Sequence, residues 1–580
     1  MQTLSKKVKI ICITLAAVVL LSVLGFFVLP AGLESCNPNG IKIDKTKTQL
    51  YVRIHDGGYG TTWLTNLSAR FEEAYADYPG EDGKVGVQII PDANKNIIQD
   101  VSDITGSRNE VFMIEQFSNY IEFVKAGAFI DITDVVTEQV DANKTDYNPD
   151  GTILGRYTEE QEAFYNIDNK YYGIPHYASY SGFHYDVDLW EREYPLCLYL
   201  DDNGKFVTDA KNVSLRSKGP DNIKGTHDDG LPATYDEFFK VFDRMVATQV
   251  TPIIWSGFSQ GYYWNTLCNL QANADGFDNY YLNYSLSGKA NNIVESVTLG
   301  SNFESTVLKV NEKDITDENA YLLFGSSGRY YASKFMEKII TNYNKYVYFD
   351  SFSPTHSHLD AQYDFIASKY DTTQKPIGMI IEGTWWENEV SARFEDMAVV
   401  YGEEASRKGR NFAFLPYPLP KKLADGETHQ NILLNNGATH SFINSSIDES
   451  KVELAKDFLR FFYTEKELIN FTLETNTSIG LKYELSDEQL KELSPYGRSL
   501  LLTVMNSKVL YQYSQNPVFL NNITNLQQSS TWQAEIETSL GLVTKTDMMN
   551  AYRYDDTSAE DYFWGMVEKY DKEWWQNNII

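Results

Sequence analysis

The chain has 580 residues, which is too long for one small hydrophobic core and predicts two or more domains. Its 80 Asp and Glu residues exceed its 50 Lys and Arg residues, which gives a net charge of −30 at pH 7. So acidic a chain excludes nucleic-acid binding, because it cannot neutralise phosphates, and disfavours docking on an anionic membrane surface. The 40 Tyr and 10 Trp residues either line a binding cleft or fill large cores and cover the surface, and both interpretations stay open.

Residues 1–35 have the pattern of an export segment. Three basic residues, Lys6, Lys7 and Lys9, precede a mostly apolar run, Ile10–Leu29. The run is long enough to cross a bilayer as a helix. The segment therefore predicts either a cleaved signal or an uncleaved membrane anchor.

The residues after the apolar run favour lipoprotein processing. In Leu33-Glu34-Ser35-Cys36, a small residue directly precedes a cysteine, so that Cys36 would become the lipid-modified first residue. Glu34 departs from this pattern, because that position is usually small or apolar. With either anchor the chain is expected to be exported and tethered, and the polar residues 36–47 are expected to form a flexible tether.

The spacing of the four cysteines does not indicate a metal or redox site. Cys12, Cys36, Cys197 and Cys268 form no CxxC pair and no Cys/His cluster, so a zinc site is not expected. Cys197 and Cys268 could pair with each other, but two free buried thiols are the expectation.

The segment 218–230 is the one stretch with metal-ligating character. It is punctuated by glycines and offers oxygen ligands of the kind that Ca²⁺ prefers, from Asp221, Asn222, Asp228 and Asp229. The spacing is not that of an EF-hand. The segment is therefore either a structural calcium site or a solvated acidic turn, and no other cofactor is expected.

Strand and helix patterns alternate in the first part of the chain. Apolar runs of strand length are Leu50–Ile54, Val85–Ile90, which Pro91 is expected to stop, and Val111–Ile114. Alternation with short links predicts βαβ units and a mostly parallel sheet. Asp56 and Gln116 follow the first and third runs, so both are candidate partners for ligand hydroxyls at the edge of the sheet.

The stretch Pro376–Glu387 is the strongest candidate for a binding edge. Its apolar run, Ile377–Ile381, predicts a strand, after which Gly383 breaks the pattern; Thr384 and Glu387 have the spacing of a capping box that opens a helix. Glu382 and the pair Trp385-Trp386 then lie at the carboxyl end of a strand, where open α/β sheets bind ligands. A hydrogen-bonding acid beside flat apolar rings suits a sugar.

Three stretches resemble one known family. Glu382-Gly383-Thr384-Trp385-Trp386 resembles the Gly- and Trp-containing turn of the extracellular solute-binding proteins, family 1, of carbohydrate ABC transporters, the maltodextrin-binding-protein-like cluster. Tyr172–Pro175 followed by Ser181–Asp186 is similar to the segment in which that family's chain passes from one lobe to the other, although Asp186 stands where Asn is common. Gly127–Thr133 resembles a third family segment, in which Asp131 or Thr133 is expected to cap the next helix.

The resemblance covers residues 48 to about 500 and implies an α/β, two-lobed, periplasmic-binding-protein-like fold of type II. Such a fold has a three-strand hinge and a ligand cleft between the lobes. The expected division places residues 48–173 and 357–435 in the first lobe. Residues 174–356 and 436–580 are then expected in the second lobe.

The resemblance also implies the binding residues. A bound sugar would stack on Trp385 or Trp386, and Glu382 and Gln116 would take its hydroxyls. Rings near the hinge and on the second lobe, with polar groups at the strand ends, complete the expected set, which is Tyr180, Trp255, Trp264, Asp56 and Asn436. For Tyr180, Trp255 and Trp264, simple packing in the interior is the alternative.

The expected function is that of a membrane-tethered receptor. It would capture a carbohydrate, expected to be an oligosaccharide, on the extracellular face of the membrane of a Gram-positive bacterium and deliver it to the permease subunits of an ABC transporter. A monomer without catalytic residues is expected. The alternatives are an anchored glycoside hydrolase that uses Glu382 as one of two carboxylates, and a surface carbohydrate-binding protein without transport.

Overall fold

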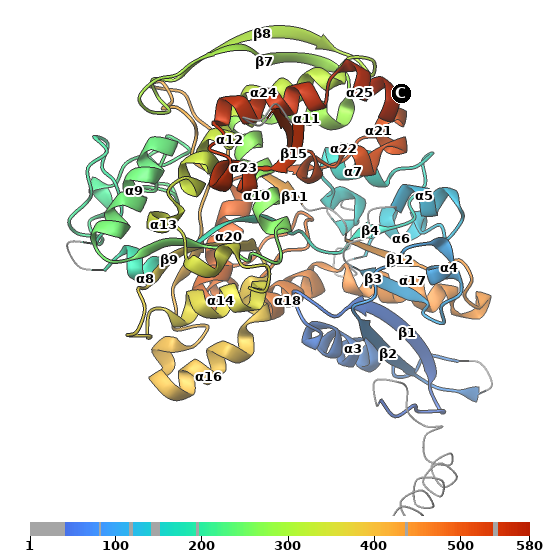
Figure 1. Cartoon of the computed structure of the whole chain (residues 1–580). Coiled ribbons are helices and arrows are strands. Elements are labelled where there is room, and N and C mark those ends of the chain that lie inside the picture. Colours follow the sequence, from blue (N-terminus) through green and yellow to red (C-terminus); the bar gives the residue numbers. More distant parts are fainter. Residues whose placement is uncertain are drawn as a thin grey trace, which may run out of the picture.

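The chain folds into two α/β lobes that lie side by side (Figure 1). The computed structural model describes residues 41–80, 83–114, 120–140, 151–192, 196–435, 439–537 and 543–580. Each lobe has its own hydrophobic core. Among the described residues, no helix is long and apolar enough to cross a membrane; the segment Ile10–Leu29 and Cys36 lie outside them.

The first lobe is built on a five-stranded sheet in the order β2-β1-β3-β12-β4. Its strands are β1 (Thr48–His55), β2 (Val87–Asn94), β3 (Val111–Ile114), β4 (Ile174–Pro175) and β12 (His440–Ile443). β1 pairs in parallel with β2 and β3, whereas β12 is antiparallel to both of its neighbours. Pro91 does not stop the second strand as expected. It pairs with Val52 inside β2, and it is tolerated because β2 is an edge strand.

The second lobe is built on a four-stranded sheet in the order β10-β5-β9-β6. Its strands are β5 (Ser181–Asp186), β6 (Thr251–Ile254), β9 (Ile377–Gly383) and β10 (Phe412–Phe414). Smaller pairs extend this lobe, namely β7 (Gly288–Thr298) with β8 (Val307–Ile315), β11 (Ile432–Asn435) with β13 (Lys508–Tyr511), and β14 (Gln533–Glu537) with β15 (Val543–Asp547). The β7–β8 hairpin arches over the lobe at the top of Figure 1.

Helices cover both sheets. Those that contribute to the core of the first lobe are α3 (Thr62–Ala74), α4 (Val101–Thr105), α5 (Tyr120–Lys125), α6 (Thr133–Thr137), α7 (Glu159–Tyr165), α17 (Glu449–Phe462) and α18 (Glu465–Thr475).

The second lobe has more helices. Those that contribute to its core are α8 (Val187–Trp190), α9 (Tyr235–Ala247), α10 (Gly261–Asp275), α11 (Phe277–Ser285), α12 (Ser327–Ile340), α13 (Tyr343–Tyr346), α14 (His358–Ala367), α15 (Trp386–Glu389), α16 (Ser391–Tyr401), α20 (Pro495–Met505), α21 (Pro517–Asn521), α22 (Ile523–Leu526), α23 (Met548–Tyr554), α24 (Ala559–Lys569) and α25 (Lys572–Asn578). The short helix α19 (Asp487–Glu492) has no buried residue.

The division between the lobes differs from the expected one. β9 pairs with β5 and β6, so that residues 357–435 belong to the second lobe and not to the first. β12 pairs with β3, and α17 and α18 pack in the core of the first lobe, so that the segment from His440 to Leu481 belongs to the first lobe and not to the second. Strands buried on both faces have the same apolar pattern in either sheet, and the pattern alone does not say which sheet they join.

Three segments cross between the lobes and bond to one another. His176 N–H donates to the carbonyl oxygen of Thr439 at 3.3 Å, and Ala178 N–H donates to that of Ser478 at 3.0 Å. Ser179 N–H donates to Oδ1 of Asn435 at 3.2 Å. The crossings near residues 178, 439 and 478 therefore lie side by side as a three-segment hinge.

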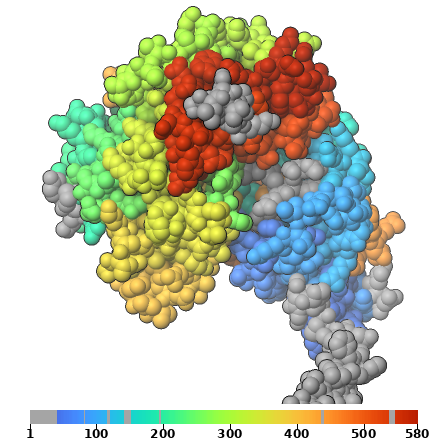
Figure 2. Space-filling model, viewed as in Figure 1, coloured from blue at the N-terminus to red at the C-terminus, as the bar shows by residue number. Residues whose placement is uncertain are grey.

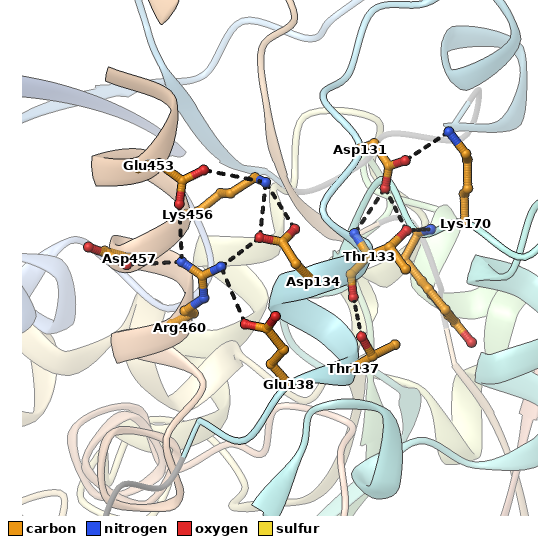
Figure 3. A network of polar contacts seen from close by, with 11 residues as sticks. Asp131, Thr133, Asp134, Thr137, Glu138, Lys170, Glu453, Lys456, Asp457 and Arg460 are labelled. Carbon is orange, nitrogen blue, oxygen red and sulfur yellow. Dashed lines mark hydrogen bonds and ion pairs between the residues drawn. The ribbon is translucent and has the colours of Figure 1, made fainter. Parts of the chain in front are cut away.

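A polar network ties distant parts of the first lobe together (Figure 3). Asp134 on α6 lies between two cations of α17, with Oδ1 2.9 Å from Lys456 Nζ and Oδ2 2.6 Å from Arg460 Nη2. Asp131 accepts from the backbone N–H of Thr133 at 3.0 Å, and Lys170 pairs with the same carboxylate at 3.0 Å. The expected cap by Asp131 or Thr133 is wrong, because α6 begins after Ile132 without a side-chain cap. These bonds fix α6 against α17 across more than 300 positions of sequence.

Candidate functional site

Strand β9 brings the Glu382–Trp386 turn to the boundary between the lobes. All seven residues of the strand are buried. The turn is held by Thr384, whose N–H donates to the carbonyl oxygen of Tyr180 at 2.9 Å and whose hydroxyl accepts from Tyr180 N–H at 3.2 Å. The expected capping box is therefore wrong, because the Thr384 hydroxyl is taken by Tyr180, and α15 begins after Trp385 without a side-chain cap.

The side chain of Trp385 contacts aromatic rings of both lobes. It follows a strand of the second lobe, yet its half-buried side chain packs against the core of the first lobe. Its ring lies 6.5 Å from that of Tyr59, which comes from the loop after β1, and 5.7 Å from that of Tyr262 at the start of α10. Both contacts are edge-on. Three aromatic rings from facing edges of the two lobes thus converge at one place.

The surface is hollowed where these elements meet. Figure 2 shows an indentation between the yellow surface that includes α14 and α16 and the blue surface of the first lobe. On the first lobe, the loop after β1 includes Gly60 at φ 71°, a left-handed backbone conformation that favours glycine. This turn lets the chain bend into α3 and leaves Tyr59 directed toward Trp385.

Trp386 has a different place from its neighbour. Its side chain is fully buried in the second lobe, where its ring lies 5.2 Å from Phe412, 5.4 Å from Tyr496 and 5.8 Å from Phe365. Of the two adjacent tryptophans, the structure therefore directs Trp385 to the lobe boundary and Trp386 into the core. The expectation that either ring could stack on a sugar is narrowed to Trp385.

The other predicted rings are mostly interior. Tyr180 and Trp255 are 2% and 1% exposed, and Trp255 packs against Tyr263 and Phe352, so packing in the interior is what the structure gives for both. Trp264 is half-buried and contacts the ring of Tyr263 at 4.9 Å.

Tyr262 is the residue of α10 that reaches Trp385, and it is not among the residues predicted from the sequence. It lies two positions before Trp264, and residues two apart on a helix do not share a face. The hydrophobic pattern of the helix gave no signal that distinguishes the two faces, because rings occupy positions 262, 263 and 264 in succession.

Glu382 is a buried carboxyl group without a counter-charge. It is 0% exposed; Oε1 accepts from Gly383 N–H at 2.9 Å, and Oε2 has no hydrogen-bond partner. Burial and the nearby charge of Glu389 raise its pKa well above the usual range, against the opposing hydrogen bonds from Gly383 and Gln362. The shift favours the protonated form of Glu382, and in this arrangement the carboxyl group lies behind the surface of the cleft.

A row of polar side chains near Glu382, formed by Gln362, Glu389 and His358, was not predicted from the sequence. Gln362 Nε2 donates to Glu389 Oε2 at 2.8 Å, and His358 Nε2 lies 3.9 Å from Glu389 Oε1. Burial raises the pKa of Glu389 to about 7, although the Gln362 hydrogen bond and the charge of Lys95 oppose the shift. Lys95 is exposed on the first lobe, at the end of β2, and its charge also acts on His358 of the second lobe. Polar groups of both lobes thus flank the aromatic rings.

The remaining predicted residues fall in three groups. Asp56 is half-buried directly after β1, on the loop that carries Tyr59, so it belongs to the same edge. Gln116, Asn436 and Cys36 lie outside the described residues. Cys197 and Cys268 are buried and free, as expected.

The carboxylates of the 218–230 loop accept hydrogen bonds from within the loop, although Asp229 Oδ1 has no partner among the described residues. Asp228 accepts from Asp221 N–H at 3.0 Å and from the Thr226 hydroxyl at 2.7 Å, and Asp229 accepts from Gly225 N–H at 2.9 Å. Asn222 donates to the carbonyl oxygen of Glu427 at 2.7 Å. Within the described part of the chain, no group of three or more His, Cys, Asp or Glu side chains could hold a metal ion.

No protein-family model matches the chain, and no curated relative matches it. Solved structures do. A chitin oligosaccharide binding protein matches 92% of this chain and 99% of its own, at 13% identity and a TM-score of 0.50. RafE from Streptococcus pneumoniae in its apo form matches 93% and 100%, at 14% identity and a TM-score of 0.49. Maltose-bound MalE3 of T. maritima matches 90% and 99%, at 14% identity and a TM-score of 0.48.

At such low identity the likeness to the chitin oligosaccharide binding protein establishes the fold and nothing finer. The two separate cores, the two sheets and the three crossing segments agree with it. The chain has the α/β, two-lobed, periplasmic-binding-protein-like fold that the sequence predicts.

Proposed function

We propose that the protein is a receptor that binds a carbohydrate between its two lobes. The observation that carries the proposal is the position of Trp385, half-buried between Tyr59 of one lobe and Tyr262 of the other. The C–H face of a sugar ring packs well on an aromatic face, and a ring at the lobe boundary is reached by a ligand from solvent. The chitin oligosaccharide binding protein, which shares this fold, is named for a carbohydrate ligand, and this supports the choice of solute.

The polar groups around the rings suit hydroxyl groups. Asp56 and Lys95 lie on the first lobe, and His358 and Glu389 lie on the second. Together they offer acceptors and donors on both sides of a bound ligand, which is what a ring with hydroxyls around its rim requires. A ligand that contacts both lobes favours the closed arrangement over the open one by the difference of its affinities for the two.

The transport role follows from the closed form and from the sequence. A receptor that closes on a solute presents a different surface from the open one, and a permease can recognise that surface. The basic and apolar N-terminal segment and Cys36 would tether this receptor on the extracellular face of the membrane. We therefore propose delivery of the carbohydrate to the permease subunits of an ABC transporter, with the protein acting as a monomer.

Glycoside hydrolysis is the less favoured function. It would need two carboxyl groups about 5–10 Å apart on either side of the sugar. Glu382 and Glu389 both have raised pKa values, but both lie on the second lobe, and Glu382 is 0% exposed. In this arrangement Glu382 is not accessible to a glycosidic oxygen. Binding without turnover is therefore the better-supported activity.

A glycan screen tests the proposal. The full chain, in a nonionic detergent because of its apolar N-terminal run, is heated in the presence of mono- and oligosaccharides. Binding to the native state raises the melting temperature in proportion to the logarithm of ligand concentration once the site is saturated. We expect one class of glycan to do so, and chromogenic glycosides of that class to stay intact. A screen without any stabilisation contradicts sugar binding, and release of the chromophore supports the hydrolase.

A further inference from the structure

A second cavity lies between the lobes, away from the aromatic rings described above. Its volume is about 690 Å³, which is enough for a small organic molecule. One wall belongs to the first lobe and consists of α7 and the turn after it. The other wall belongs to the second lobe and consists of α11, the end of β13 and the residues that follow β13. None of the residues that line this cavity belongs to the set around Trp385.

The wall from the first lobe is strongly acidic. Glu159, Glu160, Glu162 and Asp168 line the cavity, and no Lys or Arg side chain does in the part of the chain that the structure describes. Among the described residues none of these four carboxylates forms an ion pair. The three glutamates lie in the first turn of α7, where the helix dipole favours negative charge. Asp168 lies beyond the helix, so the dipole does not explain its presence at the same cavity.

The wall from the second lobe is aromatic. Tyr281, Tyr511 and Tyr513 line it, all half-buried. The hydroxyl oxygen of Tyr513 is buried and has no hydrogen-bond partner. Burial and the charge of Glu160 raise the pKa values of Tyr281 and Tyr511, which places this carboxylate close to both rings across the lobe boundary. Carboxylates that face tyrosine rings attract a cation through two interactions, the negative charge of the carboxylates and the quadrupole of the rings.

The wall is also connected to the hinge. Gln161 of α7 is 0% exposed; its Nε2 donates to the carbonyl oxygen of Gly480 in the third crossing segment at 2.5 Å and to the Tyr511 hydroxyl. The positions of the acidic wall and of Tyr511 are thereby fixed relative to each other. This side chain therefore links the acidic wall to the aromatic wall beside the cavity.

We propose that this cavity is a binding site for a small organic cation that carries one or more aliphatic ammonium groups. The ammonium groups contact the carboxylates of α7 and Asp168, and the methylene chain or ring lies against Tyr281 and Tyr513. An amino sugar and a polyamine share this chemistry. The site is independent of the carbohydrate cleft proposed above, because the two share no residue.

Calorimetric titration of the full chain with spermidine, and separately with glucosamine, tests the site in 150 mM KCl, which screens non-specific attraction to an acidic protein. Two variants remove the proposed contacts, namely Glu160→Gln with Glu162→Gln, and Tyr281→Ala. Glu488→Gln is the matched control, because Glu488 is an exposed carboxylate in the first turn of another helix, α19. Melting temperatures show whether each variant folds.

We expect one site per chain for at least one of the two cations. The double glutamine variant should weaken binding roughly tenfold and Tyr281→Ala about threefold, while Glu488→Gln stays within about twofold of the parent. A preference for spermidine or for glucosamine then identifies the source of the ammonium group. Several weak sites, no binding in 150 mM KCl, or equal losses in the pocket variants and in Glu488→Gln would each overturn the proposal.

Discussion

The buried carboxyl group of Glu382 makes the stability of the protein depend on pH in a predictable way. Its pKa in the unfolded chain is that of an ordinary glutamate, about 4.3, whereas burial raises the pKa in the folded state well above that. Between these two values the folded protein binds one more proton than the unfolded chain. The free energy of unfolding therefore falls by about 1.4 kcal/mol for each pH unit, as the linkage relation requires.

Glu382→Gln removes this dependence. The amide has the shape of the protonated carboxyl group and can still accept from Gly383 N–H. As the pH rises above about 5.5, we expect the variant to gain stability relative to the parent, by about 1.4 kcal/mol for each pH unit below the folded-state pKa of Glu382. Each kcal/mol corresponds to roughly 2–4 °C in melting temperature for a large domain.

Thermal unfolding at half-unit pH steps measures this difference. Glu395→Gln on α16 is the matched control, because Glu395 is an exposed glutamate of the same lobe. The titration of Glu389 is present in both proteins and cancels to first order. Parallel melting curves for Glu382→Gln and the parent would refute the reasoning, since they would mean that Glu382 is ionised in the folded state.

Three further outcomes follow from the contacts. Trp386→Ala should lower the free energy of unfolding by about 3–5 kcal/mol, measured in urea, because it empties a fully buried site among aromatic rings. Arg410→Met should cost about 3 kcal/mol in the same assay, because it leaves Asp186, 2.7 Å away, buried without its counter-charge. The pKa of Glu389, about 7, predicts that glycan affinity rises from pH 6 to pH 8 as the carboxylate becomes an acceptor, and that Glu389→Gln flattens this calorimetric profile.

The sequence predicts the fold class well but not the path of the chain between the lobes. Runs such as Val111–Ile114 become strands as expected, because apolar β-branched segments of this length have few other ways to be buried. Strand β9 is buried on both faces, and its pattern fits either sheet equally. β9 pairs with β5 in a register that places Ser181 opposite Gly383. These residues are about 200 positions apart in the sequence, so a local hydrophobic pattern cannot predict the pairing. For this reason the expected lobe boundary was wrong after residue 356.

The candidate site could be predicted only in part. The turn at Gly383 predicts that the tryptophan rings after it lie at the end of a strand, and Trp385 lies there. Which of the two adjacent tryptophans points outward depends on where α15 begins. The capping pattern predicts the wrong start for this helix, because the Thr384 hydroxyl accepts from Tyr180 N–H and does not cap α15. Tyr262 and Glu389 come to the site through tertiary packing alone, so no spacing in the sequence indicates them.

Titration of the stabilising glycan into three proteins tests the central claim most directly. These are the parent, Trp385→Ala, and Trp264→Ala, whose half-buried ring contacts Tyr263 and not the rings at the lobe boundary. The account predicts one site per chain, a loss of affinity of tenfold or more, about 1.4 kcal/mol, in Trp385→Ala, and a change within about threefold in Trp264→Ala. Affinity within twofold of the parent in Trp385→Ala would contradict a sugar held against this ring between the two lobes.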